Sequence, residues 1–378
     1  MQARYESFGG ILSLSHPPGT AYVDQGAMRS LGYAGSPVWE QQSHYLSAPL
    51  TAHFAVTHRC PLGCRMCYNN SGSSAAAELS TGEIKSILDT LAQMRVFTVA
   101  FGGGEPLSRP DIFELAHYTR QVGMTPTMTT NGYFIDPEMA RRCRVFDHIH
   151  VSLDGVGETY AASRGVDGFA HADRAIRLLR QQHIPLGVNC IVSRANFDQL
   201  DELGRYLRSM GVADVIFLRL KPTGRATHTY QQLRLTAEQA RSFYPCFVSL
   251  VRRYHLRAHV DCAMMPLLYY HQPGLKRLRL TCGEGCRGGN EIIEVSPTGQ
   301  VHACSFAAGS AGDARQLAET WHTAPHLQRF RQPAAAASEP CRSCSYLELC
   351  RGGCHAIAEE LAGDFDAPDP ECPFVNGG

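Results

Sequence analysis

The chain has 378 residues and equal numbers of basic and acidic side chains, 35 of each, so its formal charge is zero. This balance excludes the basic excess that attracts nucleic acids and anionic membranes, and no apolar run reaches the roughly 18 residues that suggest a membrane span. The N-terminus also lacks a signal-like pattern, so the sequence predicts a large cytoplasmic protein without nucleic-acid or membrane partners.

Residues 1–48 predict a small N-terminal element. Residues 8–14 and 21–24 have the composition of strands, and a short helical stretch follows them. One interpretation is an arm that covers the edge of a neighbouring sheet.

Six apolar strands alternate with helices between residues 49 and 225. Ser80 can cap the first helix while Glu83 reciprocates, and Ile84, Ile87 and Leu91 then fall on one face. We expect further helices at 111–121, 168–182 and 198–210. This alternation predicts an α/β fold with a partial (β/α)6 TIM-type barrel, whose active site lies at the carboxyl ends of the strands. The predicted strands are 51–57, 97–101, 125–129, 148–152, 186–192 and 214–219.

The first predicted strand leads into the most informative motif, Cys60-x3-Cys64-x2-Cys67. Three thiolates can hold three corners of a four-iron, four-sulfur cube, which leaves one iron open to bind a small molecule. A zinc site is the alternative, and it would need a fourth ligand such as His53 or His58. The cysteine spacing and a later glycine turn coincide, and together they favour the cube.

Glycines and polar residues follow the other predicted strands. Some of them could be ordinary turns or strand ends, but their position at one rim of the barrel makes them candidates for binding a cofactor. The candidates at these strand ends are Gly103, Gly104, Glu105, Asn131, Ser152 and Asn189.

The pattern changes after residue 225. A bridging helical segment is expected at 226–280, with a helix at 235–254, and a cysteine-rich domain at 281–378 contains a hairpin at 292–295 and 300–304. Two fully ligated cubes need eight thiolates, and this region supplies that number. A zinc ribbon is the alternative, but it would leave several thiols unexplained. The eight are Cys282, Cys286, Cys304, Cys341, Cys344, Cys350, Cys354 and Cys372.

The cysteine loop and the turn Gly102-Gly103-Gly104-Glu105 resemble the signature of the radical S-adenosylmethionine (radical SAM) superfamily. This resemblance implies that the open iron binds SAM and that an electron cleaves SAM to a 5'-deoxyadenosyl radical. It further implies that Gly103, Gly104 and Glu105 hold the methionine amino end and that Tyr68 lies beside the adenine. Ser152 would face the ribose or carboxylate, Arg164 would pair with the carboxylate, and Asn131 and Asn189 would be further strand-end contacts.

The C-terminal cysteines resemble the SPASM extension, which binds two auxiliary [4Fe-4S] clusters, so the resemblance implies three clusters and SAM in total. The interleaved family pattern assigns Cys282, Cys286, Cys304 and Cys354 to the first auxiliary cluster. Either Cys282 or Cys286 could be the leading cysteine of that pattern, and with only one of them bound the cluster would have an open iron. The second auxiliary cluster would be held by Cys341, Cys344, Cys350 and Cys372.

Several stretches are similar to mycofactocin-type radical maturases and other maturases of ribosomally made peptides, among them Pro222-Thr223-Gly224-Arg225 and Cys350-Arg351-Gly352-Gly353-Cys354. The resemblance implies a peptide-modifying oxidoreductase or lyase that takes hydrogen from a precursor peptide, with tyrosine as the favoured target. Oxidative decarboxylation, excision or cross-linking would follow. The local spacing at 285–289 departs from this family and leaves the first auxiliary cluster open to question.

The partners implied are a precursor peptide and a flavodoxin or ferredoxin-type electron donor. Residues 1–48 also resemble the opening of a leader-peptide-recognition domain, too short to be a whole one, so a small separate leader-recognition protein is expected. The alternatives are a sulfatase-type maturase that oxidises cysteine or serine, a thioether-forming maturase and, outside enzymes, a metal-stabilised electron carrier.

Overall fold

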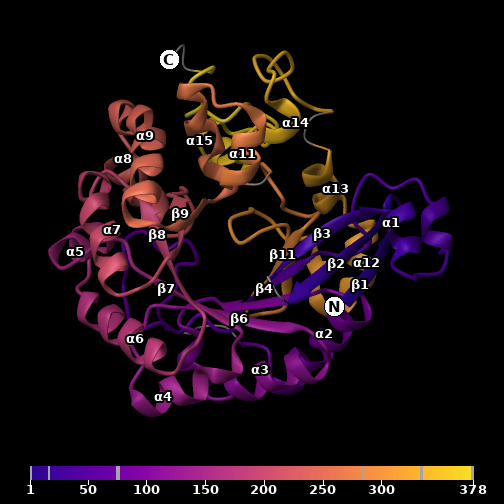
Figure 1. The fold of residues 1–378 in the computed structure, drawn as a ribbon, viewed down its shortest axis with the longest axis horizontal. Helices are drawn as coiled ribbons and strands as arrows, with labels where there is room; N and C mark the ends of the chain where they lie inside the picture. Colours follow the sequence, from indigo (N-terminus) through magenta and orange to yellow (C-terminus); the bar gives the residue numbers. More distant parts are fainter. Residues whose placement is uncertain (1, 16–17, 74–76, 283, 333–334, 376–378) are drawn as a thin grey trace.

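The computed structural model describes residues 2–15, 18–73, 77–282, 284–332 and 335–375 (Figure 1). Six parallel strands follow one another in chain order across the barrel, each paired with the next. This confirms the predicted partial barrel, with strand ends within two residues of the prediction. The strands are β4 (Thr51–Ala55), β5 (Thr98–Gly102), β6 (Thr125–Thr130), β7 (His148–Ser152), β8 (Leu186–Val192) and β9 (Asp214–Arg219).

Helices cover the outside of this sheet, as Figure 1 shows. The capping box predicted for the first helix forms, because the Ser80 hydroxyl accepts from the Glu83 amide and the Glu83 carboxylate accepts from the Ser80 amide. Its face with Ile84, Ile87 and Leu91 is buried in the same apolar cluster as Phe54 of β4. The helices are α2 (Thr81–Gln93), α3 (Ile112–Gln121), α4 (Pro137–Arg142), α5 (Glu158–Arg164), α6 (Phe169–Gln181) and α7 (Leu200–Ser209), with 3-10 turns η2 (Pro106–Ser108), η3 (Cys143–Val145) and η4 (Phe197–Gln199).

The bridging segment is not purely helical, which corrects the prediction for 226–280. It contains β10 (Arg257–Val260), which pairs in parallel with β9 and extends the barrel sheet. A four-residue strand with two basic side chains carries too weak an alternation to be recognised in the sequence. The other elements are α8 (Ala226–Leu233), α9 (Ala237–Tyr254), η5 (Cys262–Met264), α10 (Met265–Leu268), η6 (Tyr269–His271) and α11 (Leu275–Cys282).

The predicted C-terminal hairpin forms and joins the other edge of the barrel. Strand β11 (Ile292–Val295) pairs in parallel with β4, and β12 (Gln300–His302) and β13 (Gly312–Asp313) follow as antiparallel neighbours. The result is a sheet of ten strands in the order β10-β9-β8-β7-β6-β5-β4-β11-β12-β13. The remaining elements are η7 (Ala314–Gln316), α12 (Leu317–Thr323), α13 (Pro325–Arg331), α14 (Leu347–Cys350) and α15 (His355–Ala362).

The N-terminal element is a separate antiparallel sheet of three strands, not two, followed by α1 (Gln25–Ser30) and η1 (Pro37–Glu40). The strand that the prediction missed is β1 (Gln2–Glu6), ahead of β2 (Gly9–Ser15) and β3 (Pro18–Asp24). This strand was not predicted because it contains the charged residues Arg4 and Glu6. In the structure the two form a buried ion pair, with 2.7 Å between Arg4 Nε and Glu6 Oε1. Arg4 also donates to the Pro49 carbonyl at 2.8 Å and lies over the Phe97 ring, so the small sheet packs on the barrel.

A search of the described helices finds none with the length and apolar character needed to cross a membrane.

Candidate functional site

The cysteine loop leaves the carboxyl end of β4 and is held in place by hydrogen bonds with Gly72 and with Arg225. The Cys60 amide donates to the Gly72 carbonyl at 2.9 Å. Arg225, just before α8, donates its amide to the Cys67 carbonyl and its Nε to the Cys64 carbonyl, both at 2.9 Å. The loop is therefore fixed by contacts that do not involve its thiols.

Each of the three thiols faces a polar donor: one follows β6, one ends α5 and one lies in the cysteine loop itself. The Asn131 amide nitrogen lies 3.5 Å from Cys60 Sγ, and a terminal nitrogen of Arg164 lies 3.6 Å from Cys64 Sγ. The Ser71 backbone amide lies 3.5 Å from Cys67 Sγ. Donors in these positions stabilise anionic sulfur, which is the form that binds iron. Burial raises the pKa of Cys60 to about 11, so cluster assembly must release its proton. The residues present fit a three-thiolate cluster.

The glycine turn is packed against this loop at close range. A Cβ on Gly104 would lie 2.2 Å from the Arg59 carbonyl oxygen, and Gly103 has a φ of +113°, so both positions require glycine. The Gly104 amide donates to Thr57 at 2.7 Å and the Glu105 amide donates to Arg59 at 2.8 Å. The turn and the cysteine loop thus form one rigid unit.

The Glu105 carboxylate is fully buried and points into the protein. It accepts from the Thr130 hydroxyl at 2.7 Å and from the Asn131 amide at 2.8 Å. Burial raises its pKa to about 7. Glu105 therefore braces the end of β6, next to the residue that faces Cys60. The contacts predicted between this turn and SAM stay predictions.

Ser152 and Asn189 are register partners at the ends of β7 and β8. Among the described residues, the buried Asn189 Oδ1 atom has no hydrogen-bond partner, which leaves it open for a ligand. Arg164 ends α5, and its Nε lies 2.6 Å from Oδ2 of the fully buried Asp154. Asp154 was not among the predicted site residues, although the Ser152-Leu153-Asp154-Gly155 motif offered a signal. It orients Arg164 toward Cys64.

Tyr68 connects the cysteine loop to the C-terminal domain. Its ring centroid lies 5.0 Å from that of Phe306, and Lys221 Nζ lies 4.1 Å from the Phe306 centroid. Burial raises the pKa of the Tyr68 hydroxyl well above its usual value, and the nearby Glu294 adds to this shift. The predicted contact of Tyr68 with adenine stays a prediction.

Glu294 lies near Tyr68 and was missed by the sequence analysis, which named His53 only as a possible zinc ligand. His53 of β4 and Glu294 of β11 are register partners, and His53 Nδ1 lies 3.2 Å from the Ser305 hydroxyl. Burial raises the pKa of Glu294 to about 7 and lowers that of His53 to about 4. Only the pairing of β4 with β11, which is not readable from the sequence, brings them together.

The structure also gathers the cysteines assigned to the second auxiliary cluster. They line one pocket, and Tyr269 and Phe374 line it as well. The four thiols on one pocket fit the ligand set of a cube. They are Cys341, Cys344, Cys350 and Cys372.

Three cysteines of the proposed first auxiliary cluster also lie near one another. Burial raises the pKa of Cys286, and the neighbouring Cys304 and Cys354 raise it further. Cys282 ends α11, but its side chain lies outside the part of the chain that the structure describes. Of the four ligands predicted for this cluster, the structure therefore locates Cys286, Cys304 and Cys354, but not the side chain of Cys282.

The spacing of these thiols can be compared with that of a zinc site. Sulfur atoms around one tetrahedral zinc lie about 3.8 Å apart, given a bond length of about 2.3 Å. Within the described ranges, the only group of three or more ligand atoms that all lie within 4.8 Å is His148, His150 and Asp214. No three thiols among the described residues lie so close together.

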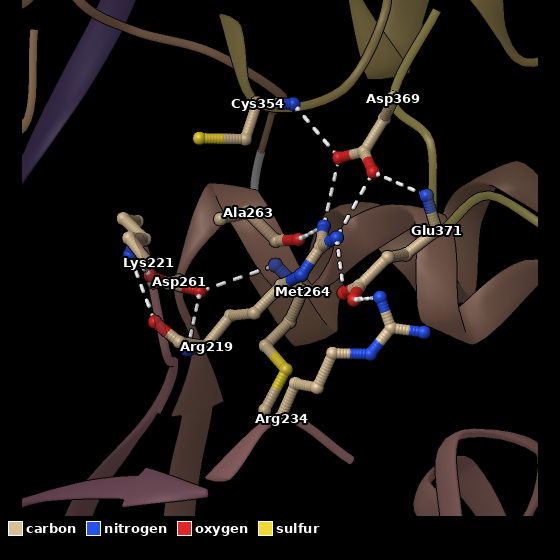
Figure 2. A network of polar contacts seen from close by, with 9 residues as sticks. All are labelled: Arg219, Lys221, Arg234, Asp261, Ala263, Met264, Cys354, Asp369 and Glu371. Atoms are coloured by element: carbon tan, nitrogen blue, oxygen red, sulfur yellow. Dashed lines mark hydrogen bonds and ion pairs between the residues drawn. The ribbon is translucent and has the colours of Figure 1, made fainter. Parts of the chain in front are cut away.

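A buried polar network fastens the barrel to the cysteine-rich domain (Figure 2). Arg219 of β9 binds Asp369 through two hydrogen bonds and Glu371 through a third. Asp369 also accepts from the Cys354 amide at 3.2 Å. The position of a proposed cluster ligand thus depends on a barrel side chain.

Comparisons with known proteins agree with this geometry. A model of the radical SAM superfamily matches residues 54–207, and the SPASM model, an iron-sulfur cluster-binding domain, matches residues 286–345. Mycofactocin maturase MftC of Mycobacterium ulcerans (strain Agy99) is 33% identical over 344 residues, which cover 88% of this chain and 90% of that protein. The AdoMet-dependent heme synthase of Methanosarcina barkeri (strain Fusaro / DSM 804) is 28% identical over 347 residues, 88% of this chain and 98% of that protein.

Among solved structures, Streptococcus suis SuiB, crystallised with S-adenosylmethionine and with its precursor peptide SuiA, aligns with a TM-score of 0.76. The alignment covers 98% of each chain at 17% identity, and it shows a shared fold. The matching models and the similarity to MftC lead to one conclusion: this chain is an enzyme of the radical SAM superfamily that carries an SPASM iron-sulfur domain.

Proposed function

We propose that this enzyme matures a ribosomally made precursor peptide by abstracting hydrogen from one of its residues, with tyrosine as the favoured target. The observation that carries the proposal is the 33% identity to a mycofactocin maturase over 88% of this chain. Oxidative decarboxylation, excision or cross-linking of the peptide is the expected outcome.

The proposed cofactors are SAM and three [4Fe-4S] clusters, one on Cys60, Cys64 and Cys67 and two in the SPASM domain. When bound, the first cluster and SAM supply reductive cleavage of the cofactor and removal of a hydrogen atom from the substrate. The chain's own residues hold the cofactor at the rim of the barrel. The backbone of Gly103 and Gly104, the Asn189 amide and the Arg164 guanidinium are the proposed contacts, with Asp154 as a positioning residue for Arg164.

The proposed reaction space is the barrel interior between Tyr68 and the C-terminal hairpin. Glu294 is buried there, and its pKa of about 7 suits a group that takes up and releases a proton near neutral pH. We assign it the proton that the substrate would lose after hydrogen abstraction, and the auxiliary clusters, when bound, would supply the electron acceptor. Burial of the site would keep water away from the reacting carbon.

The proposed partners are the peptide, a small leader-recognition protein and a flavodoxin or ferredoxin-type electron donor, in the cytoplasm. The N-terminal sheet offers a surface for the peptide and the leader-recognition protein. Phe8 and Tyr22 are exposed there, with ring centroids 5.9 Å apart. An extended peptide could add to the edge of this sheet.

The test is anaerobic turnover of the reconstituted enzyme with SAM, dithionite and short candidate peptides. We expect 5'-deoxyadenosine together with a mass change of the peptide. A loss of about 46 mass units would be carbon dioxide plus two hydrogen atoms, as expected for oxidative decarboxylation, whereas smaller losses point to thioether formation or to oxidation of cysteine or serine. If only a heme precursor were converted, the peptide proposal would be wrong and the similarity to heme synthase would define the substrate.

A further inference from the structure

Cys262 was assigned no role from the sequence, yet it lies among the ligands of the proposed first auxiliary cluster. Burial raises the pKa of Cys286, and Cys262 is the first of the neighbouring thiols that raise it further. Cys262 raises the pKa of Cys304 and Cys354 in the same way. These electrostatic effects accompany the contacts described next, which place Cys262 beside these cysteines.

A direct contact fixes this proximity. The Cys262 sulfur accepts a hydrogen bond from the backbone amide of Arg287, the residue that follows Cys286. Cys262 therefore touches the segment that carries the leading cysteine of the SPASM motif. The contact also stabilises the thiolate form of Cys262, which is the form that would bind iron.

The turn that carries Cys262 is held rigidly beside Cys354 by Arg219 (Figure 2). One nitrogen of this guanidinium donates to the Ala263 carbonyl at 2.7 Å and also binds Asp369 at 2.7 Å. Asp369 in turn accepts from the Cys354 amide. Ala263 and Cys354 share one small apolar cluster as well, so two independent contacts place the Cys262 turn next to this ligand.

The charges around the four thiols suit an anionic cluster. Lys221 lowers the pKa of Cys262, Cys304 and Cys354, opposing the effect of burial. Lys221 is itself held by Asp261, whose carboxylate lies 2.5 Å from Nζ and directly precedes Cys262. A buried cation beside four sulfur ligands offsets part of their negative charge.

We propose that Cys262 is the fourth protein ligand of the first auxiliary cluster, together with Cys286, Cys304 and Cys354. On binding iron, the Cys262 thiol loses its proton to solvent and forms one iron–sulfur bond. The cluster is then fully ligated without Cys282 and acts as an electron acceptor, not as a substrate-binding site. This assignment rests on the proposed presence of two auxiliary clusters.

The experiment uses a parent variant in which Cys60, Cys64 and Cys67 are all replaced by alanine, so that only auxiliary clusters assemble. Cys262→Ala, Cys282→Ala and the control Cys246→Ala are added to it separately, and iron, sulfide and the low-temperature EPR spectrum of the reduced proteins are measured. Cys246 is a thiol of α9 with no proposed ligand role.

The parent should hold about eight irons per chain. We expect Cys262→Ala to lower the iron content toward four, or to change the EPR signal of one cluster, while the signal of the other cluster reports an intact fold. Cys282→Ala and Cys246→Ala should match the parent. If the parent holds eight irons and Cys262→Ala has the same spectrum and iron content as the parent, the assignment of Cys262 is wrong, while the proposed cluster count stands. A parent with only about four irons would overturn the proposed cluster count and this assignment together.

Discussion

Arg219 of β9 holds Asp369 of the SPASM domain in a fork, with distances of 2.7 Å from NH1 to Oδ2 and 2.9 Å from NH2 to Oδ1. Both side chains are buried, and Glu371 is a second acceptor for the same guanidinium. This relationship ties the last barrel strand to the loop before Cys372.

Removing one partner of this fork should destabilise the protein strongly, because an unpaired charge would remain buried. We expect Asp369→Asn to lower the free energy of unfolding by about 3–5 kcal/mol. The matched control is Asp366→Asn, which removes the exposed ion pair with Arg329 and should cost less than about 1 kcal/mol. Denaturant unfolding of the cluster-free chains measures both. Equal losses for the two variants would show that the fork does not hold the domains together.

Two neighbouring glycines should respond differently to alanine. In Gly104→Ala the new Cβ would lie 2.2 Å from a backbone oxygen, whereas at Gly102 nothing lies within 4 Å. Overpacking of this kind costs about 1–3 kcal/mol, and here it would also push the turn away from the cysteine loop. Thermal unfolding and the SAM dissociation constant should therefore change in Gly104→Ala. Gly102→Ala should resemble the unmodified enzyme, and matching behaviour of the two variants would contradict the close packing.

Glu294 should make stability depend on pH. Burial raises its pKa from 4.5 to about 7, so the folded state keeps a proton that the unfolded state has lost between these values. Stability relative to Glu294→Gln should therefore be greatest below pH 4.5, fall as the pH rises and level off above 7. The total change is about 3 kcal/mol at most. Urea unfolding of both proteins from pH 4 to 8 measures it, and parallel curves would show that Glu294 is not buried as described.

Local patterns in the sequence were enough to predict much of the barrel. The strand His148–Ser152 and the capping box of Ser80 and Glu83 depend on neighbouring residues only, so alternation and spacing reveal them. Strands β1 and β10 were missed because their charged residues are paired or exposed in ways that only tertiary contacts decide.

The residues of the candidate site were likewise predictable only where their signal is local in the sequence. Cysteine spacing pointed to the loop of Cys60, Cys64 and Cys67, because those ligands lie close in the chain. Asp154, Glu294 and Cys262 gain their proposed roles from contacts with residues 10 to 241 positions away, from Asp154 with Arg164 to Glu294 with His53. The pairing of β11 with β4 and of β10 with β9 brings such residues to the barrel interior. No local signal in the sequence specifies those pairings.

The most direct test of the central claim is whether SAM binds the cluster on Cys60, Cys64 and Cys67. A variant with alanine at Cys286, Cys304, Cys344 and Cys350 should retain this cluster alone, and its reduced EPR spectrum is recorded with and without SAM. We predict that SAM shifts the spectrum and that 5'-deoxyadenosine forms on further reduction. A spectrum that SAM leaves unchanged, in a protein with about four irons per chain, would contradict the account.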